Sequence, residues 1–330
     1  VKNLSGNERT EQQQDKLHAA TLFAQGRMQY RRRNFEQSLK HFQRAWRYGR
    51  SVVSITNELI PLAINLKRDT VAAQYAELAL ETGNLDPQAL GRIAVVLTKK
   101  QRYDGAIEAY QTLLASKPKN RVDDSFVAIH VEIARVSLLS GNAEMAASSH
   151  DIVRYTLEHR DQNLVSAATS KRLQGQGGVL YQMMIESYLQ TKQYKKAQTA
   201  FDKLNMLYPQ EVMNPLRLAK ILTAQELFAE ATTQLNRYFE SKSTRGAATP
   251  YKLLIEINRQ KIKDTTAANK ASVLTLQGIL VEQHDNHHLA FTLAELLANS
   301  AEDTDDYAAA SHKIYRQFLP TQASPVGYRN

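Results

Sequence analysis

Three histidines lie close together near the C-terminus, in the run HDNHH that contains His284, His287 and His288. On a helix, His284 and His288 would be one turn apart, so with Asp285 beside them they could share a metal ion. The run falls at a turn between two predicted helices, however, and no glutamate follows in the zinc-hydrolase arrangement. We therefore expect surface histidines at a helix start, with no metal and no cofactor.

A glycine cluster at Gly175, Gly177 and Gly178 precedes a predicted helix, as a phosphate-binding loop would. No predicted strand comes before it and no Lys-Ser/Thr pair comes after it, both of which that loop requires. We interpret the cluster as a flexible break in the chain. Because the sequence also contains no cysteine, disulfides, thiolate nucleophiles and Cys-ligated metal sites are excluded. No catalytic constellation remains, and the chain is predicted not to be an enzyme.

Arginine and aromatic side chains alternate between Arg27 and Arg50, where the chain carries Tyr30, Arg31, Arg32, Arg33, Phe35, Lys40, Arg44, Trp46, Arg47 and Tyr48. Such a mixture can bind single-stranded nucleic acid through phosphate contacts and base stacking. Phe35 and Phe42, however, fall on an apolar helical stripe and are predicted to be core residues. A solvated face or a patch for a partner protein fits the segment better, with RNA as the alternative ligand.

Charge is distributed unevenly along the chain, whose net charge is +9. Residues 1–50 contain 11 Lys/Arg and 4 Asp/Glu, whereas residues 271–312 contain 7 acidic residues and no Lys or Arg. One end is therefore basic and the other acidic. This polarity would allow weak head-to-tail self-association, so we expect a monomer or a weakly associating chain.

The secondary structure of the chain is clearest in the stretch from Pro87 to Pro118. Its sequence predicts two short amphipathic helices joined by a turn. The first apolar stripe consists of Leu90, Ile93, Ala94 and Leu97, and the second of Ala106, Ile107, Tyr110, Leu113 and Leu114. Spacings of three and four place each set on one helix face. A hairpin of this size cannot bury both stripes alone, so neighbours of the same kind are predicted.

A fixed repeat length supports that prediction. Small residues recur 34 positions apart at Ser38, Ala72 and Ala106, and again at Ala197 and Ala231. Between these blocks the step widens, and it drifts again towards the C-terminus. The regular steps predict stacked units of one size, separated by an interruption in the middle of the chain.

The third unit reads Leu90-x2-Ile93-Ala94-x2-Leu97, followed by Ala106-x3-Tyr110-x2-Leu113-x4-Pro118. With the 34-residue period, this pattern resembles the tetratricopeptide repeat, which reads W-x2-L-G-x2-Y and then A-x3-F-x2-A-x4-P. The resemblance covers roughly residues 20–320 and is weakest near the end. It implies an all-α fold, a right-handed superhelical solenoid of helical hairpins.

Eight hairpins are expected, in two arrays. The expected helices are 12–33 and 35–49, 52–66 and 69–83, 87–100 and 103–116, 122–140 and 143–159, 179–191 and 194–207, 212–225 and 228–241, 250–262 and 265–282, and 286–299 and 303–318. The expected divisions are an N-terminal array at 1–160, an irregular linker or inserted segment at 161–178, a C-terminal array at 179–319 and a disordered tail at 320–330.

The resemblance also implies a concave groove lined by the first helix of each hairpin. Its candidate binding residues here are Phe23, Arg27, Tyr30, Arg31, Arg92, Lys99, Arg135, Arg217 and Lys220. Most are basic, which favours an acidic peptide or protein partner. The family's clamp for a terminal carboxylate is not matched, because Phe23 and Arg27 replace its Lys and Asn. The expected function is a non-catalytic interaction scaffold, or alternatively the regulatory part of a larger enzyme or of a secretion or assembly machine.

Two further expectations concern the surroundings of the chain and its core. No apolar run reaches the length of a membrane-spanning helix. The chain starts at Val1, which is compatible with removal of a leader, and the sequence fits a cytoplasmic, periplasmic or exported protein. His130 and His150 occupy inward positions of the repeat pattern and are predicted to be core side chains.

Overall fold

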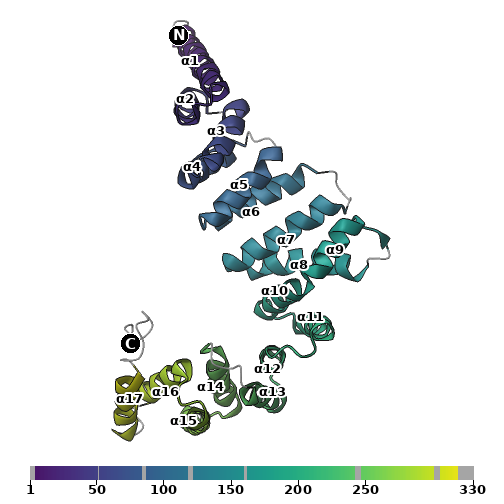
Figure 1. The fold of residues 1–330 in the computed structure, drawn as a ribbon, viewed down its shortest axis with the longest axis vertical. Helices are drawn as coiled ribbons and strands as arrows, with labels where there is room; N and C mark the ends of the chain where they lie inside the picture. The colour runs from purple at the N-terminus through teal and green to yellow at the C-terminus, as the bar shows by residue number, and fades with distance from the viewer. Residues whose placement is uncertain are drawn as a thin grey trace. The chain divides into compact units, whose positions relative to one another are not determined.

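The structure is a computed structural model that describes residues 4–50, 52–83, 87–117, 122–159, 162–241, 247–300 and 305–318. Its regular elements in these ranges are α-helices (Figure 1), and no strand occurs among them. The fold is therefore the all-α repeat that the sequence predicts. No helix in the described ranges combines the length and apolar character that crossing a bilayer requires.

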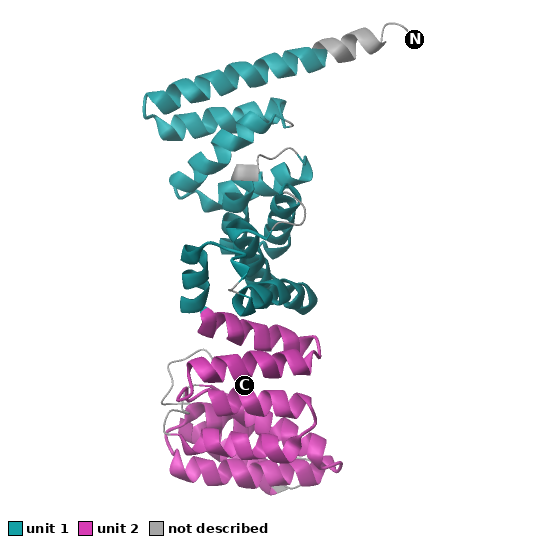
Figure 2. Cartoon of the chain, turned by 90° about the vertical axis from the view of Figure 1, so that its right-hand side faces the viewer, with its two compact units in different colours: residues 1–176 teal, residues 177–330 magenta. Residues whose placement is uncertain are grey.

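The chain divides into two compact units, residues 1–176 and 177–330 (Figure 2). The helices of the first unit are α1 (Leu4–Arg31), α2 (Phe35–Tyr48), α3 (Val53–Asn65), α4 (Asp69–Glu81), α5 (Pro87–Lys99), α6 (Tyr103–Ala115), α7 (Asp124–Leu139), α8 (Ala143–Glu158) and α9 (Ala167–Gly175). The helices of the second unit are α10 (Gly177–Gln190), α11 (Tyr194–Leu207), α12 (Asn214–Ala224), α13 (Phe228–Glu240), α14 (Thr249–Lys261), α15 (Thr265–Glu282), α16 (His287–Asn299) and α17 (Asp305–Phe318).

The hairpin turns reproduce the 34-residue period in backbone geometry. Arg33, Lys67 and Gln101 sit in the turns of the first three hairpins with φ of 62°, 57° and 59°, and Lys192 and Glu226 occupy the equivalent place in the second unit with φ of 57° and 62°. Left-handed backbone is unusual for residues with a side chain. Its recurrence at one position shows that the hairpins share a turn geometry.

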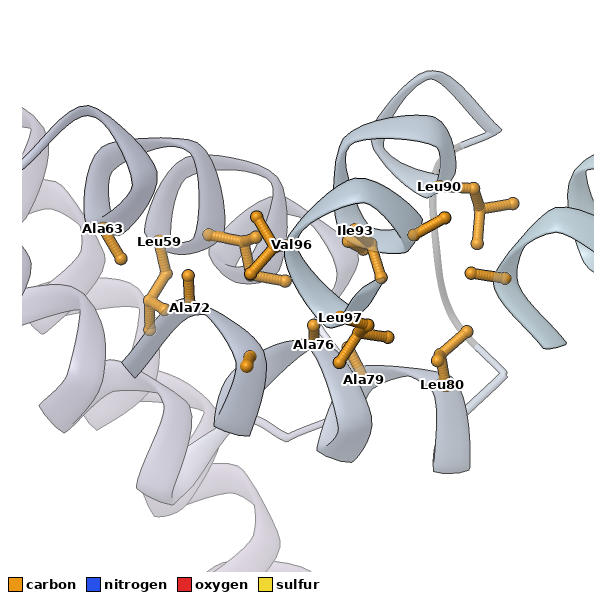
Figure 3. Packing of buried hydrophobic residues seen from close by; sticks show 14 of the residues in the cluster. Leu59, Ala63, Ala72, Ala76, Ala79, Leu80, Leu90, Ile93, Val96 and Leu97 are labelled. Atoms are coloured by element: carbon orange, nitrogen blue, oxygen red, sulfur yellow. The ribbon is translucent and has the colours of Figure 1, made fainter. Parts of the chain in front are cut away.

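Small residues let the helices of each hairpin approach closely. In the first hairpin the Ser38 hydroxyl donates to the Gly26 carbonyl at 2.8 Å, across α1 and α2. A Cβ atom added at Gly26 would lie 2.5 Å from the Phe42 ring. Ala72, Ala76 and Ala79 play the same part on α4, where they pack fully buried beside the leucine and isoleucine side chains of α3 and α5 (Figure 3).

The first helix begins earlier than the sequence pattern indicates. The expected start is residue 12, whereas α1 begins at Leu4. The sequence of residues 4–11, LSGNERTE, contains a single apolar residue, so it carries no apolar stripe that would indicate a helix. The other expected helices agree with the structure to within a few residues. Helix α9 is an additional helix that the sequence does not predict.

The segment 162–178 contains a helix that the sequence does not predict, and the boundary between the two compact units falls within its glycine cluster, after Gln176. The flexible break expected there stays a prediction. The N-cap residue of this helix, α9, is Ser166, which is bound to Asp124 of α7 through its backbone N–H at 2.7 Å and its hydroxyl at 2.6 Å. Gly178 lies inside α10, where an added Cβ would come within 2.7 Å of the Tyr208 ring. Close packing of α10 on Tyr208 therefore explains why residue 178 is a glycine.

The expected disordered tail at 320–330 lies outside the described residues.

Candidate protein-binding groove

A groove runs between the first helices of the second and third hairpins, α3 and α5. It encloses a volume of about 500 Å³ and is lined by Pro61, Ile64, Asn65, Gly91, Arg92, Val95 and Val96. Of the binding residues predicted from the sequence, Arg92 belongs to this lining. The lining combines an aliphatic surface with one cationic and one amide side chain.

Pro61 shapes the α3 side of this groove. Proline has no N–H, so the carbonyl of Asn57, one turn earlier, receives no helical hydrogen bond from it. The side-chain oxygen of Asn57 is also buried, and no residue that the structure describes donates a hydrogen bond to it. Asn57, Pro61 and Asn65 are four residues apart and so share one face of α3. On the α3 side, the groove lining itself contains Pro61, Ile64 and the amide of Asn65, and no charged side chain.

The α5 side supplies the charge and an exposed aliphatic surface. Arg92 is exposed, and within the described ranges no carboxylate forms an ion pair with it. Val95, one turn further along α5, is 57% exposed although valine is usually buried. Gly91 leaves room beside them, because the nearest atom to an added Cβ is Leu113 Cδ2 at 3.9 Å. The guanidinium therefore stands beside an uncovered apolar surface.

Other predicted groove cations are already paired with acids of the same chain. Arg27 lies 3.9 Å from a carboxylate oxygen of Glu58, and Arg135 lies 2.6 Å from Glu132. Lys99 hydrogen-bonds to Asp69, which holds the pKa of that carboxyl below its usual value. These pairs reduce the basic character expected from the sequence. Arg92 and Arg31 are the predicted cations of this unit that have no such partner among the described residues.

The first hairpin places the predicted aromatic residues in different surroundings. Phe23 is half-buried against the Phe42 ring, with ring centroids 5.5 Å apart. Phe42 is fully buried, as predicted, but Phe35 is 38% exposed, so its assignment to the core is wrong. Phe35 instead meets the exposed Tyr30 edge to face at 5.3 Å, beside Arg31. The α1–α2 turn thus presents an aromatic pair next to arginine.

Two predicted residues, Arg217 and Lys220, lie on α12 in the second unit. Both are half-buried, and Arg217 donates to the Asn214 side-chain oxygen at 3.0 Å. Burial lowers the pKa of the Arg217 guanidinium, while the nearby Glu211 opposes the shift. Arg217 is thus held by its own helix.

A second groove, which the sequence did not predict, lies between α14 and α16. It has a volume of about 410 Å³ and is lined by Lys252, Ile255, Glu256, Arg259, Gln260, Thr292, Glu295, Leu296 and Asn299. Its charges are mixed, and Lys252 approaches Glu295 at 3.9 Å. The repeat period has drifted in this region, so the family pattern could not be aligned to these residues.

The histidine cluster is dispersed by the helix boundary. Helix α16 starts at His287, so His284 lies outside it and does not stand one helical turn from His288. The His287 ring packs against Phe318, with centroids 5.6 Å apart. Among the described residues, no group of three or more His, Asp or Glu side chains could hold a metal ion.

His150 is a core residue, as predicted, and is fully buried in α8. Its burial lowers its pKa to about 4, although Asp151 acts in the opposite direction. His130 is half-buried, with Nδ1 located 3.3 Å from the Ser149 hydroxyl, and burial lowers its pKa as well. Both side chains are therefore neutral parts of the α7–α8 hairpin near pH 7.

Comparison with known proteins gives a family match in the region of the groove. Residues 72–121 match the family model described as tetratricopeptide repeat. No curated protein matches the chain. The repeat architecture supports a protein-interaction scaffold in general, and such repeats are in general non-catalytic.

Several solved structures resemble the chain at low sequence identity. A tetratricopeptide repeat protein from Parabacteroides merdae is 13% identical, with 86% of this chain and 99% of that chain covered and a TM-score of 0.39. The C-terminal part of a repeat-containing protein from Cytophaga hutchinsonii is 16% identical, with coverage of 81% and 97% and a TM-score of 0.42. The TPR2AB domain of yeast Sti1, in its pHSP90 complex, is 16% identical, with coverage of 89% and 98% and a TM-score of 0.29. Residues 72–121 are thus similar to the tetratricopeptide repeat, and helical hairpins lie on either side of them in the described part of the chain.

Proposed function

We propose that the chain is a non-catalytic scaffold that holds an acidic peptide or protein segment in the groove between α3 and α5. The observation that carries this proposal is the exposed Arg92, which has no ion-pair partner among the described residues and stands beside the uncovered aliphatic surface of Val95. Exposed apolar surface next to a lone cation is typical of a site that a partner covers.

The groove lining defines the chemistry of the partner. A carboxylate can form a two-pronged hydrogen bond with the Arg92 guanidinium, and an aliphatic side chain nearby in the partner can cover Val95. The amide of Asn65 can bind backbone groups of the same segment. The best ligand is therefore an Asp or Glu adjacent to an apolar residue, instead of a uniformly acidic run.

A peptide selection tests this proposal and requires no assumption about the natural partner. The full chain is used to select binders from a random peptide library, and the affinities of the selected peptides are then measured by titration calorimetry. We expect selected sequences to contain an acidic residue next to an aliphatic one. Arg92→Glu should weaken their binding by at least about tenfold, because it replaces an attraction with a repulsion in the binding site.

Arg44→Glu is the matched control, because Arg44 is also exposed and belongs to α2, outside the groove. It makes the same change in net charge and should leave the affinities unchanged. Equal binding by the wild-type chain and Arg92→Glu would refute the groove assignment.

Nucleic acid is the alternative ligand, and the exposed pair Tyr30 and Phe35 beside Arg31 supports it. A labelled single-stranded oligonucleotide provides the comparison. Binding that falls steeply with added salt and is lost in Arg31→Glu, but not in Arg92→Glu, would favour this alternative.

A further inference from the structure

The turns inside the first three hairpins are strongly basic. They consist of residues 31–33, 67–68 and 99–102, which together contain eight Lys or Arg and no Asp or Glu. Every residue in these three ranges is exposed. The corresponding turn of the fourth hairpin, residues 140–142, reads Ser-Gly-Asn and carries no charged side chain. Within this unit the basic character is therefore specific to the first three hairpins.

Two ion pairs show that these turns lie side by side. In the first, Arg68 of the second turn lies 3.1 Å from a carboxylate oxygen of Glu36, which follows the first turn at the start of α2. In the second, Lys99 of the third turn hydrogen-bonds to Asp69, which follows the second turn at the start of α4. The three turns therefore form one continuous surface, which we call the basic turn row.

The backbone of the turns does not require cations in this row. Arg33 and Lys67 have φ of 62° and 57°, and Gly141 has φ of 80° at the corresponding position of the fourth hairpin. Glycine adopts such a left-handed backbone without strain, whereas a residue with a Cβ atom does not. Arginine and lysine therefore occupy two positions that would favour glycine if the turn alone determined the residue type.

Five cations of the row are available to a ligand. Arg68, Lys99 and Arg102 are paired within the chain, the last with Glu77 at 3.6 Å. The remaining cations of the row have no ion-pair partner among the described residues, and they are Arg31, Arg32, Arg33, Lys67 and Lys100. An exposed excess of one charge sign attracts a ligand that carries many charges of the opposite sign. This surface therefore suits a polyanion.

An aromatic pair lies at one end of the row. Tyr30 and Phe35 flank the three arginines of the first turn and are 42% and 38% exposed. Their rings contact each other edge to face, with centroids 5.3 Å apart. Aromatic rings next to Lys and Arg are typical of protein surfaces that lie among the head groups of a bilayer.

A polar pocket lies between the second and third turns. It has a volume of about 400 Å³ and is lined by Thr70, Ala73, Gln74, Glu77, Lys100 and Arg102. Lys100 and Arg102 can bind phosphate oxygens there, and the Thr70 hydroxyl can donate a hydrogen bond, although Glu77 partly neutralises Arg102. A volume of this size accommodates a single small polar group such as a phosphorylated head group.

We propose that the basic turn row docks the chain on a membrane whose surface contains anionic phospholipids. The phosphates of a bilayer lie in one plane and move laterally, so each turn can bind a head group without a fixed register along the row. Tyr30 and Phe35 then lie among the head groups at the end of the row. The row shares no residue with the groove between α3 and α5, so each proposal can fail without the other.

A single-stranded nucleic acid is the other polyanion that such a charge would attract. A strand is held by a groove that follows its backbone and by aromatic faces on which successive bases stack. Here the cations lie at the tips of separate turns, and the rings of Tyr30 and Phe35 pack on each other. The arrangement therefore favours the bilayer, and nucleic acid becomes an outcome of the test.

Co-sedimentation of the full chain with vesicles tests the proposal. We expect the chain to bind vesicles of phosphatidylcholine mixed with phosphatidylglycerol, to bind those of phosphatidylcholine alone much more weakly, and to be released by added salt. Each cation near an anionic surface contributes about fivefold to partitioning. The combined variant Arg32→Glu, Lys67→Glu and Lys100→Glu, which changes one unpaired cation in each turn, should therefore lower partitioning at least about a hundredfold.

The matched control combines Arg44→Glu, Arg47→Glu and Arg50→Glu, which change the net charge by the same amount. These arginines are exposed and belong to the second half of α2 or follow it. Even Arg44 lies about 14 Å along α2 from its first residue, beyond the screening length of about 8 Å in physiological salt. The control should lower partitioning by less than about tenfold. Circular dichroism verifies that both combined variants are folded.

Three results would overturn membrane docking. The first is equal binding of the wild-type chain to neutral and anionic vesicles, and the second is an equal loss of binding in the two combined variants. The third is binding to a labelled oligothymidylate without binding to the anionic vesicles, which would assign the row to nucleic acid.

Discussion

Helices α1 and α2 approach each other closely at Gly26. We therefore expect Gly26→Ala to destabilise the protein, although helix propensity alone predicts that it stabilises. Alanine favours a helix over glycine by about 1 kcal/mol, so Gly→Ala inside a helix normally stabilises. At Gly26, however, the new methyl group would lie 2.5 Å and 2.6 Å from two carbons of the Phe42 ring. Phe42 is fully buried and packs against Phe23, so its ring has little room to move.

Overpacking of this kind costs typically about 1–3 kcal/mol, which outweighs the gain in helix propensity. We therefore expect Gly26→Ala to lower the free energy of unfolding by about 1–2 kcal/mol. Gly91→Ala is the matched control, because Gly91 also lies inside a helix and its nearest neighbour, at 3.9 Å, is at an ordinary contact distance. This second substitution should raise stability by up to about 1 kcal/mol.

Urea unfolding followed by circular dichroism measures both variants. Trp46 is the single tryptophan of the chain and is buried in α2, so its fluorescence reports the first hairpin directly. If Gly26→Ala stabilised the chain as Gly91→Ala does, the close approach of Gly26 to Phe42 would not be a determinant of the hairpin, and this reasoning would be refuted.

Three further predictions concern pH and the turns. Burial lowers the pKa of His150 from the unfolded value of 6.5 to about 4, so the free energy of unfolding should decrease by at most about 3 kcal/mol as the pH falls from 6.5 towards 4. Urea midpoints that do not change over this pH range in the wild type, or that change equally in His150→Gln, would contradict this prediction. Gln101→Gly should raise the free energy of unfolding by about 1 kcal/mol, because glycine adopts positive φ without strain; an unchanged urea midpoint would be inconsistent with this. The hydrogen bonds from Ser166 lower the pKa of Asp124, so the anchoring of α9 is present above the ordinary carboxyl range and lost as the pH falls through the lowered value. Asp124→Asn should accordingly speed amide exchange in α9 and leave α6 unchanged, whereas equal exchange rates in the variant and the wild type would count against the anchor.

The repeat fold could be predicted because its cause is local and periodic. Ser38, Ala72 and Ala106 mark the places where two helices approach closely, and the residues there must be small wherever that approach recurs. The same period then appears in the backbone at Arg33, Lys67 and Gln101, although no turn residue type in the sequence indicates it.

Features that depend on tertiary contacts could not be predicted. Helix α9 is short and is anchored by Asp124, which lies 42 residues before Ser166, so no local pattern reveals that contact. The reason for Gly178 is likewise distant in the sequence, because it is the ring of Tyr208. The sequence suggested flexibility at both places because it shows the residue types but not what they contact.

Only Arg92 of the groove lining was a candidate from the sequence, and the ion pairs of the other candidate cations could not be predicted. Spacing along the first helices predicts Arg92 as a groove residue, and in the structure it is exposed and lines the pocket between α3 and α5. Arg27, Lys99 and Arg135 look equivalent to it in the sequence, yet each has an acidic neighbour in the structure. The exposed Val95 was not a candidate, since an isolated valine in a helical pattern gives no signal of exposure.

The most direct test of the central claim is a charge exchange between Arg92 and a peptide selected by the groove. The affinities of wild type and Arg92→Glu are measured by calorimetry for the selected acidic peptide and for its counterpart with lysine in place of the acid. We predict that the lysine peptide binds Arg92→Glu better than wild type, with a coupling energy of at least about 1 kcal/mol. A coupling energy of zero would show that Arg92 does not contact the acidic residue and would contradict the proposed binding mode.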